Sequence, residues 1–202
     1  MGSYYYLVSQ LPYLIFGQPP PMSSYAFKDM AKLNLNGHDS GLLDMVEIDP
    51  QPHKEGDAPS YSEPSPSCGS AFIDNWREWE RTLRLNLAKQ RAVKTKRENA
   101  NIAEAPFIPA DAVQAAARAV ATAESPLEGE MLIDRARWNA IEAFQGIDYF
   151  SINSVFAYML KLLLLERREL FQTETGFAEY KSLYSSIIGS SVESSSPAGE
   201  TK

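Results

Sequence analysis

Histidine and cysteine are the residue types most often used for acid–base, nucleophilic or metal chemistry, and this chain has two histidines and one cysteine. His38 is followed by Asp39, which could form half of a metal or acid–base site, and His53 lies in a proline-rich stretch. Cys68 stands among serines and prolines with no neighbouring histidine to act as its base. Isolated groups of this kind are usually solvated, so we expect no catalytic residue, metal or cofactor.

Motifs for nucleotide binding and hydrolysis are also missing from the sequence. It contains no GxxxxGK[ST], GxGxxG, GxSxG or HExxH pattern. Glu166 and Glu169 are carboxylates one helical turn apart, but Arg167 and Arg168 lie between them. This pattern favours ion pairing at a helix surface, where the helix emerges into water. We therefore expect a protein without enzymatic activity.

The strongest charge feature is a basic stretch from residue 77 to residue 97. It holds eight Lys or Arg and two Glu, a local charge of +6 in a chain of net charge −7. Four arginines recur on one face at helical spacing, namely Arg77, Arg81, Arg84 and Arg91. Because guanidinium groups suit carboxylates, we expect this arginine row to face a protein partner or an acidic segment. The alternative is a solvated face without a partner.

The same stretch has a second interpretation, in which the helix binds nucleic acid. Trp76 and Trp79 beside the arginine row resemble a platform on which bases stack. Both tryptophans also fall on an apolar stripe with Phe72, Leu83 and Leu87, which is typical of a core. The acidic net charge repels phosphates on average. We therefore predict that the tryptophans are buried, as are Trp138, Phe156 and Met159 on later stripes, and expect no nucleic-acid partner.

The elements that position these residues are predicted to be helices. Residues 70–99 have the period of a long helix, and residues 110–123 form an Ala-rich one. Ser125, Pro126 and Glu128 make a capping box that begins the next helix. An apolar helix follows from Ile152, and its apolar stretch is shorter than the roughly 20 residues that span a bilayer. Because it is apolar nearly all round, we expect it to lie centrally.

The sequence leaves the secondary structure at the start of the chain open. The aromatic stretch from Tyr4 to Phe16 contains Pro12, and it fits either a helix that begins there or a short strand that ends there. After a triple proline, a helix capped by serine is expected from about residue 24 to residue 35, ended by Asn36–Gly37. A second short helix is expected around residues 42–46.

Composition divides the chain into four parts. Residues 1–48 are predicted to be an N-terminal helical segment, residues 49–69 a linker rich in Pro and Ser, residues 70–189 a helical domain and residues 190–202 a flexible tail. A last helix is expected at residues 176–188. The predicted fold is mainly α, a helical bundle or array with a Pro-rich loop between a short N-terminal part and a larger C-terminal part.

Two stretches resemble a known family. The first comprises Tyr4–Pro12 and Phe16–Pro21, and the second comprises Phe150–Leu162 and Leu165–Arg167. Together they resemble a bacterial family of uncharacterised proteins encoded among V/A-type ATPase genes. That family is similar to the C subunit of the archaeal-type enzyme, whose eukaryotic counterpart is the d subunit. A Tyr-x-x-(x)-Lys…Glu-x-Arg pattern on an apolar helix recurs there, and it is approximated by Tyr158, Lys161, Glu166 and Arg168.

The resemblance implies a role and partners. The C subunit of the archaeal-type enzyme is an all-helical, funnel-like protein without a catalytic site, and it seats the central stalk on the membrane ring of proteolipid subunits. This implies a non-catalytic structural subunit of a bacterial V/A-type ATPase that contacts other subunits through the arginine row and the four pattern residues. The alternatives are an assembly factor or peripheral-stalk component, and a nucleic-acid-binding module built on residues 77–97. The expected location is cytoplasmic and peripheral to the membrane, consistent with a single cysteine.

Overall fold

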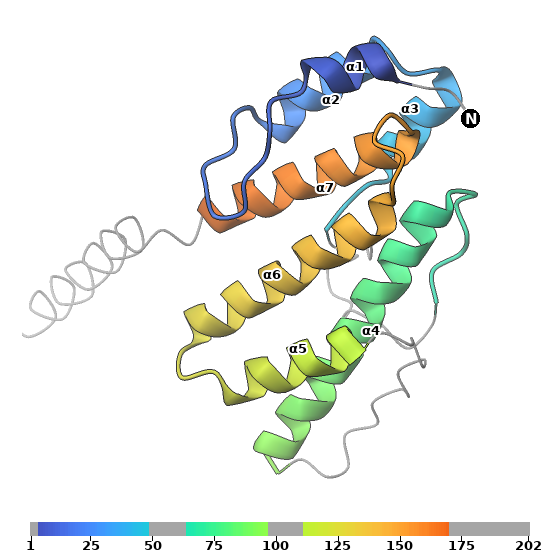
Figure 1. The fold of residues 1–202 in the computed structure, drawn as a ribbon. Coiled ribbons are helices and arrows are strands. Elements are labelled where there is room, and N and C mark those ends of the chain that lie inside the picture. The colour runs from blue at the N-terminus through green and yellow to red at the C-terminus, as the bar shows by residue number, and fades with distance from the viewer. Residues whose placement is uncertain (1–3, 49–63, 97–110, 170–202) are drawn as a thin grey trace, which may run out of the picture.

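The computed structural model describes residues 4–48, 64–96 and 111–169, which contain seven α-helices and no strand (Figure 1). Three short helices come first: α1 (Tyr5–Gln10), α2 (Ser24–Lys32) and α3 (Gly37–Asp44). Four longer helices follow: α4 (Ala71–Lys94), α5 (Asp111–Thr122), α6 (Pro126–Gln145) and α7 (Ile152–Glu169). The predicted mainly α fold is therefore confirmed. The expected helix at 176–188, the tail at 190–202 and most of the linker lie outside the described residues.

The helices form an array in which α7 is enclosed. Figure 1 shows α5 beside α4 and α6, α6 beside α7, and the N-terminal helices on the other side of α7. Buried side chains accordingly occur on nearly every face of α7, from Val155 to Leu165. The all-round apolar pattern predicted this central place, because a helix without a polar face must be covered on all sides.

Local capping explains where several helices begin and end. The Ser125 hydroxyl accepts a hydrogen bond from the Glu128 amide at 3.1 Å, which is the predicted capping box at the start of α6. Gly146 ends α6 with φ of +73°, a conformation that favours glycine. The prediction that Asn36 ends the preceding helix was wrong. The Asn36 side chain instead accepts from the Asp39 amide at 2.8 Å and begins α3.

Tertiary contacts accompany the secondary structure of the N-terminal stretch, which the sequence left open between helix and strand. The helix α1 ends before Pro12, so it is neither a helix begun by the proline nor a strand. Its first turn is held by the loop before α7, because the Tyr4 amide donates to the Phe150 carbonyl at 2.8 Å. The ring of Tyr5 also lies 4.2 Å from that of Phe150, centroid to centroid.

One continuous hydrophobic core joins the N-terminal and C-terminal parts of the chain. Leu7, Phe27 and Leu43 from the first three helices belong to the same buried cluster as Trp76 and Phe156. The Trp76 indole also donates to the Glu47 carbonyl at 2.8 Å. The five predicted core residues, Trp76, Trp79, Trp138, Phe156 and Met159, are all buried. The short N-terminal part is therefore packed into the helical domain.

Candidate functional site

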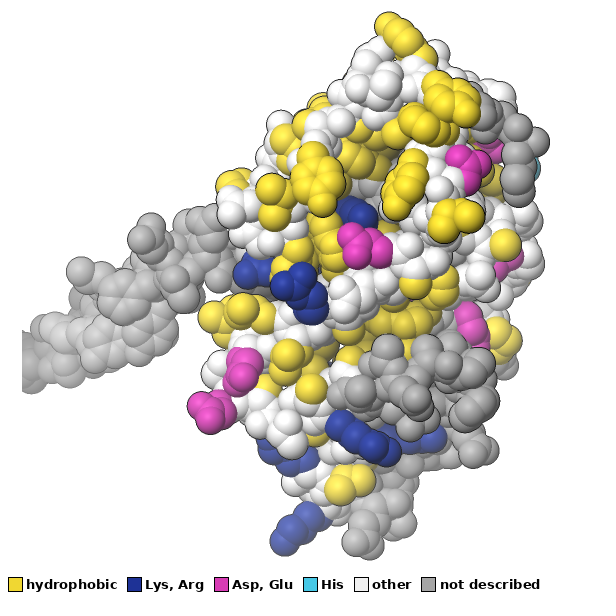
Figure 2. All heavy atoms as spheres, in the orientation of Figure 1, with side chains coloured by type: hydrophobic (Ala, Val, Ile, Leu, Met, Phe, Trp, Pro, Cys, Tyr) yellow, Lys and Arg dark blue, Asp and Glu magenta, His cyan; other side chains and the backbone are white. Residues whose placement is uncertain are grey.

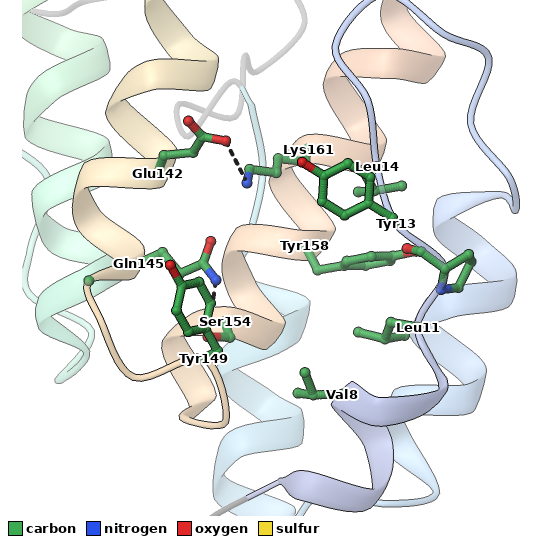
Figure 3. A pocket seen from close by; sticks show the side chains of 12 residues that line it. Val8, Leu11, Tyr13, Leu14, Glu142, Gln145, Tyr149, Ser154, Tyr158 and Lys161 are labelled. Carbon is green, nitrogen blue, oxygen red and sulfur yellow. Dashed lines mark hydrogen bonds and ion pairs between the residues drawn. The ribbon is translucent and has the colours of Figure 1, made fainter.

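A groove runs along α7 between the segment that follows α1 and the C-terminal end of α6 (Figure 3). Its volume is about 560 Å³. Tyr158, Lys161 and Ser154 on α7 form its floor, with the α6 wall on one side and the N-terminal wall on the other. The walls are lined by Val8, Leu11, Pro12, Tyr13, Leu14, Glu142, Gln145, Gly146 and Tyr149. Its lining combines apolar and polar groups in similar measure, and its volume is in the range of ligand-binding cavities.

Tyr158 fixes the N-terminal wall of the groove. Its hydroxyl donates to the Pro12 carbonyl at 3.0 Å, and its ring packs 4.8 Å from that of Phe27 on α2. Proline has no amide hydrogen, so its carbonyl is the group through which this residue can be held. Burial raises the pKa of Tyr158 to about 12, so the hydroxyl remains a protonated hydrogen-bond donor into the alkaline range.

The charged pair in the groove joins α6 to α7. Lys161 Nζ lies 3.2 Å from Glu142 Oε1 and 5.0 Å from the centre of the Trp138 ring. The same Glu142 oxygen accepts from the Trp138 indole at 2.9 Å. The lysine charge is therefore neutralised by a carboxylate and an aromatic face. This pair orients side chains across the two helices and leaves the groove without a net charge.

Exposed aromatic side chains form the rim. Tyr13 on the N-terminal wall is 87% exposed and Tyr149 on the loop before α7 is 63% exposed. Ile147 in the same loop is 95% exposed. Figure 2 shows hydrophobic side chains gathered over the N-terminal helices and the neighbouring segment on this face. Large exposed apolar groups around a groove are typical of a surface that binds another molecule.

Phe16 lies near the C-terminal end of α7, outside the residues that line the groove. Its ring packs edge-on against Trp138 of α6 with 5.5 Å between ring centres. Two guanidinium groups lie over the same ring, that of Arg135 at 4.3 Å and that of Arg168 at 5.0 Å from its centre. Gly17 follows with φ of +89°, and a Cβ there would stand 3.8 Å from the Arg168 guanidinium.

The end of α7 does not emerge into water as expected. The Glu166 carboxylate accepts a hydrogen bond from the Ser24 amide at 2.6 Å, at the start of α2. Arg167 contacts two carboxylates of α6, Glu130 at 2.7 Å and Asp134 at 2.9 Å. The ion pairs predicted along the helix surface are thus replaced by contacts to neighbouring helices, because α2 and α6 pack against both sides of this end.

The four pattern residues of α7 meet the N-terminal segment or α6. Tyr158 contacts Pro12, Lys161 contacts Glu142, Glu166 contacts Ser24, and Arg168 lies over Phe16. One of these contacts, Tyr158 with Pro12, joins the two stretches that carry the family resemblance, as do the contacts of Tyr4 and Tyr5 with Phe150. Sequence alone did not bring these stretches together. It also missed Glu142 and Arg135, although the spacing of Trp138 and Glu142, four residues apart, is a signal for a contact along one helix.

The four arginines of the row on α4 differ in burial and in their contacts. Arg81 is buried and pairs with Glu78 at 2.8 Å, and Arg84 pairs with the fully buried Glu80 at 2.8 Å. Arg77 donates to the Met45 carbonyl at 3.5 Å, whereas Arg91 is exposed. The row therefore does not form one open face for a partner, since its own helix supplies acidic groups to two of its members.

The positions of Trp76 and Trp79 do not support the nucleic-acid interpretation of α4. Trp76 and Trp79 are buried and stack on each other with 5.6 Å between ring centres. Base stacking requires an exposed ring face. The exposed basic side chains of the described part of α4 lie at its C-terminal end, at Arg91 and Lys94. The pair of tryptophans is a core feature of the fold.

The groups first considered for chemistry lie apart. His38 is exposed on α3. The carboxylate of its neighbour Asp39 accepts hydrogen bonds from the Tyr4 hydroxyl and from the side-chain amide of Asn36. His53 lies outside the described residues. Burial raises the pKa of the Cys68 thiol, and the carboxylate of Asp74, which accepts from the Cys68 amide at 3.0 Å, adds to the shift. Among residues 4–48, 64–96 and 111–169, no three potential metal ligands come together.

Comparison with known proteins gives a match to a protein family. A model of the family described as "Protein of unknown function (DUF2764)" matches residues 118–188, from the end of α5 through α6 and α7 and onward. No curated protein and no solved structure matches the chain. Over the matched stretch, which includes the floor and one wall of the groove, the chain is similar to a family of unknown function. No helix in the described ranges is both long and apolar enough to cross a bilayer.

Proposed function

We propose that this chain is a non-catalytic structural subunit of a bacterial V/A-type ATPase that links the central stalk to the membrane rotor ring. The observation that carries the proposal is the meeting of the two stretches that resemble the ATPase-associated family. They pack on each other through the Tyr158 hydroxyl on the Pro12 carbonyl, the Tyr4 amide on the Phe150 carbonyl and the rings of Tyr5 and Phe150, and an open groove lies beside these contacts.

The groove has the properties of a protein-binding surface. Its rim carries two strongly exposed tyrosines, Tyr13 and Tyr149, and tyrosine is enriched at the centres of protein interfaces. Its polar groups, Tyr158, Lys161 and Glu142, are bonded to one another or to the backbone and so hold the walls in place. A preformed site of this kind binds a partner at low ordering cost. The chain would act in the cytoplasm and reach the membrane through protein contacts.

The test is capture of partners from native membranes of the source organism by the full-length chain. We expect central-stalk and rotor-ring subunits of the ATPase to be enriched. The variant Tyr13→Ala with Tyr149→Ala should lose them, because both side chains are exposed on the rim and the fold does not depend on them. The control Tyr25→Ala removes an equally exposed tyrosine of α2 that does not line the groove.

The outcomes separate the candidate functions. Retention of the chain in the purified intact ATPase indicates a permanent subunit, whereas loss during purification indicates an assembly factor. Capture of peripheral-stalk subunits alone would place the chain there. A capture in which no ATPase subunit is enriched would overturn the proposal.

A further inference from the structure

Two arginines that lie beyond the groove, around Phe16, differ from the rest in their surroundings. Arg135 is exposed on α6, and Arg168 is half-buried on α7. Neither makes an ion pair with a carboxylate of the described residues; each lies over the ring of Phe16 instead. Arg135 has Met131, Leu132, Trp138 and Asn139 at the helical spacings where a pairing carboxylate would stand.

Arg168 has a similar lack of acidic neighbours. Leu164 and Leu165 occupy the positions three and four residues before it. Glu169 adjoins it in sequence, but consecutive residues of a helix do not face each other. One guanidinium nitrogen of Arg168, Nη1, is buried with no hydrogen-bond partner among the described residues. Within the described ranges this donor has no acceptor, and a buried donor without an acceptor is destabilising.

The two guanidinium groups lie close enough together to attract the same anion. Both guanidinium carbons lie within 5.0 Å of one ring centre, so they are no farther apart than the sum of their two distances from it. Two cations so placed attract an anion more strongly than either does alone. In a chain of net charge −7, the arginine pair forms a small cationic site separate from the basic stretch of α4. A planar guanidinium is suited to a carboxylate.

Phe16 connects this arginine pair, Arg135 and Arg168, to the groove. Its ring carries both guanidinium groups and also packs on Trp138, against which Lys161 of the groove floor lies. From Lys161 to Arg168 is seven residues, or about 10 Å along α7. A ligand that fills the groove with apolar side chains therefore reaches the arginine pair two helical turns farther along.

We infer that the groove binds an apolar segment of a partner polypeptide, and that an acidic side chain of this segment pairs with Arg135 and Arg168. The inference rests on the proposed function for the identity of the partner, another component of the ATPase. The groove itself is neutral because Lys161 is paired with Glu142, so apolar and aromatic anchors fit there. In a helical partner the acidic residue stands about seven positions from the anchor, and in an extended one about three.

The occupant is identified by photo-crosslinking in the full-length chain. The residue p-benzoylphenylalanine replaces Tyr149 on the rim or, as a control, Tyr25 on α2, and the chain is mixed with detergent-solubilised V/A-type ATPase. We expect the Tyr149 position, but not the Tyr25 position, to crosslink to one component of the ATPase. The crosslinked peptide should contain Asp or Glu at the spacing given above.

Charge variants test the arginine pair in the same mixture. Replacing both arginines by Gln should weaken binding to the ATPase at least tenfold. Replacing both by Lys should restore most of it, because the positive charges remain. The matched control, Lys94→Gln with Lys96→Gln, removes two exposed positive charges at and just beyond the end of α4 and should change affinity less than twofold. Circular dichroism checks that each variant is folded.

Each contrary result has a distinct meaning. A crosslink to residues 170–202 of the same chain, to a second copy or to lipid would overturn the inference by naming another occupant. Unchanged affinity of the Gln variant, with the chain still bound to the ATPase, would overturn the inference and leave the proposed function standing. No association with the ATPase in any form would overturn both.

Discussion

Arginines in two regions of this molecule have opposite surroundings. Between α4 and α6, Arg84 and Arg137 converge on Glu80, whose side chain is fully buried. Beyond the groove, Arg135 and Arg168 lie on the ring of Phe16 without a described carboxylate. An arginine on a helix stabilises the fold where neighbouring helices bury it beside acidic side chains. Where acids are lacking, we expect its charge to be available to a ligand.

The buried network continues across three helices. Arg137 also contacts Asp134 at 3.1 Å, and Asp134 in turn contacts Arg167 of α7 at 2.9 Å. Burial opposes the charge on Arg137, but Glu80 and Asp134 hold its pKa above normal. Burial raises the pKa of Asp134, and the two arginines oppose that shift. Such groups are tolerated in a core because each has its partners.

The largest effect is expected from breaking this network. Arg137→Met should lower the free energy of unfolding by about 3–5 kcal/mol, because it leaves Glu80 buried with a reduced set of partners. Denaturant unfolding measures the change, and Arg118→Met on the exposed side of α5 is the control. A loss of unfolding free energy below about 1 kcal/mol would show that the buried network contributes no more than an exposed ion pair. Adding Glu80→Leu to Arg137→Met should recover much of the loss.

A smaller effect is expected at the N-terminal wall. Tyr158→Phe removes the hydrogen bond to the Pro12 carbonyl and should cost about 1 kcal/mol. The loss should be local, so amide hydrogen exchange of residues 5–11 should quicken more than that of α4. Tyr25→Phe, at an exposed tyrosine of α2, is the matched control. Uniform quickening over all helices would contradict a local role.

The arginine pair should contribute less to the fold than to binding. Arg135→Gln removes one contact with the Phe16 ring and should lower the free energy of unfolding by about 0.5–1 kcal/mol. Urea titration measures this change beside the Arg137→Met variant. A loss as large as that of Arg137→Met would show that the two regions do not differ, and Arg135 would be a structural residue.

The smallest effect is a pH dependence at the edge of the fold. Lys28 and Lys32 hold the pKa of Asp44 below its usual value of 3.8. A lowered carboxyl pKa stabilises the fold above the usual pKa, and this contribution is lost as pH falls through the folded value. Asp44→Asn should therefore remove about 0.5 kcal/mol at pH 7 and almost nothing at pH 2, since the pair is half-exposed. An equal loss at both pH values would exclude titration of Asp44 as the cause.

Sequence determined most of the helices and their buried faces. The capping box at Ser125, the glycine at 146 and the apolar stripe through Trp76 act within a turn or two of chain, where local hydrogen bonding and periodicity suffice. The pairing of Arg81 with Glu78 and of Arg84 with Glu80 was equally available from spacings of three and four residues.

Only the tertiary structure decided which of these elements meet. No local rule places Pro12 against Tyr158, Ser24 against Glu166 or Phe16 between two arginines, because these partners lie more than a hundred residues apart in the chain. Their contacts exist because α7, apolar nearly all round, must be covered on the side that α6 leaves open. The N-terminal segment covers it incompletely, and the uncovered part is the groove.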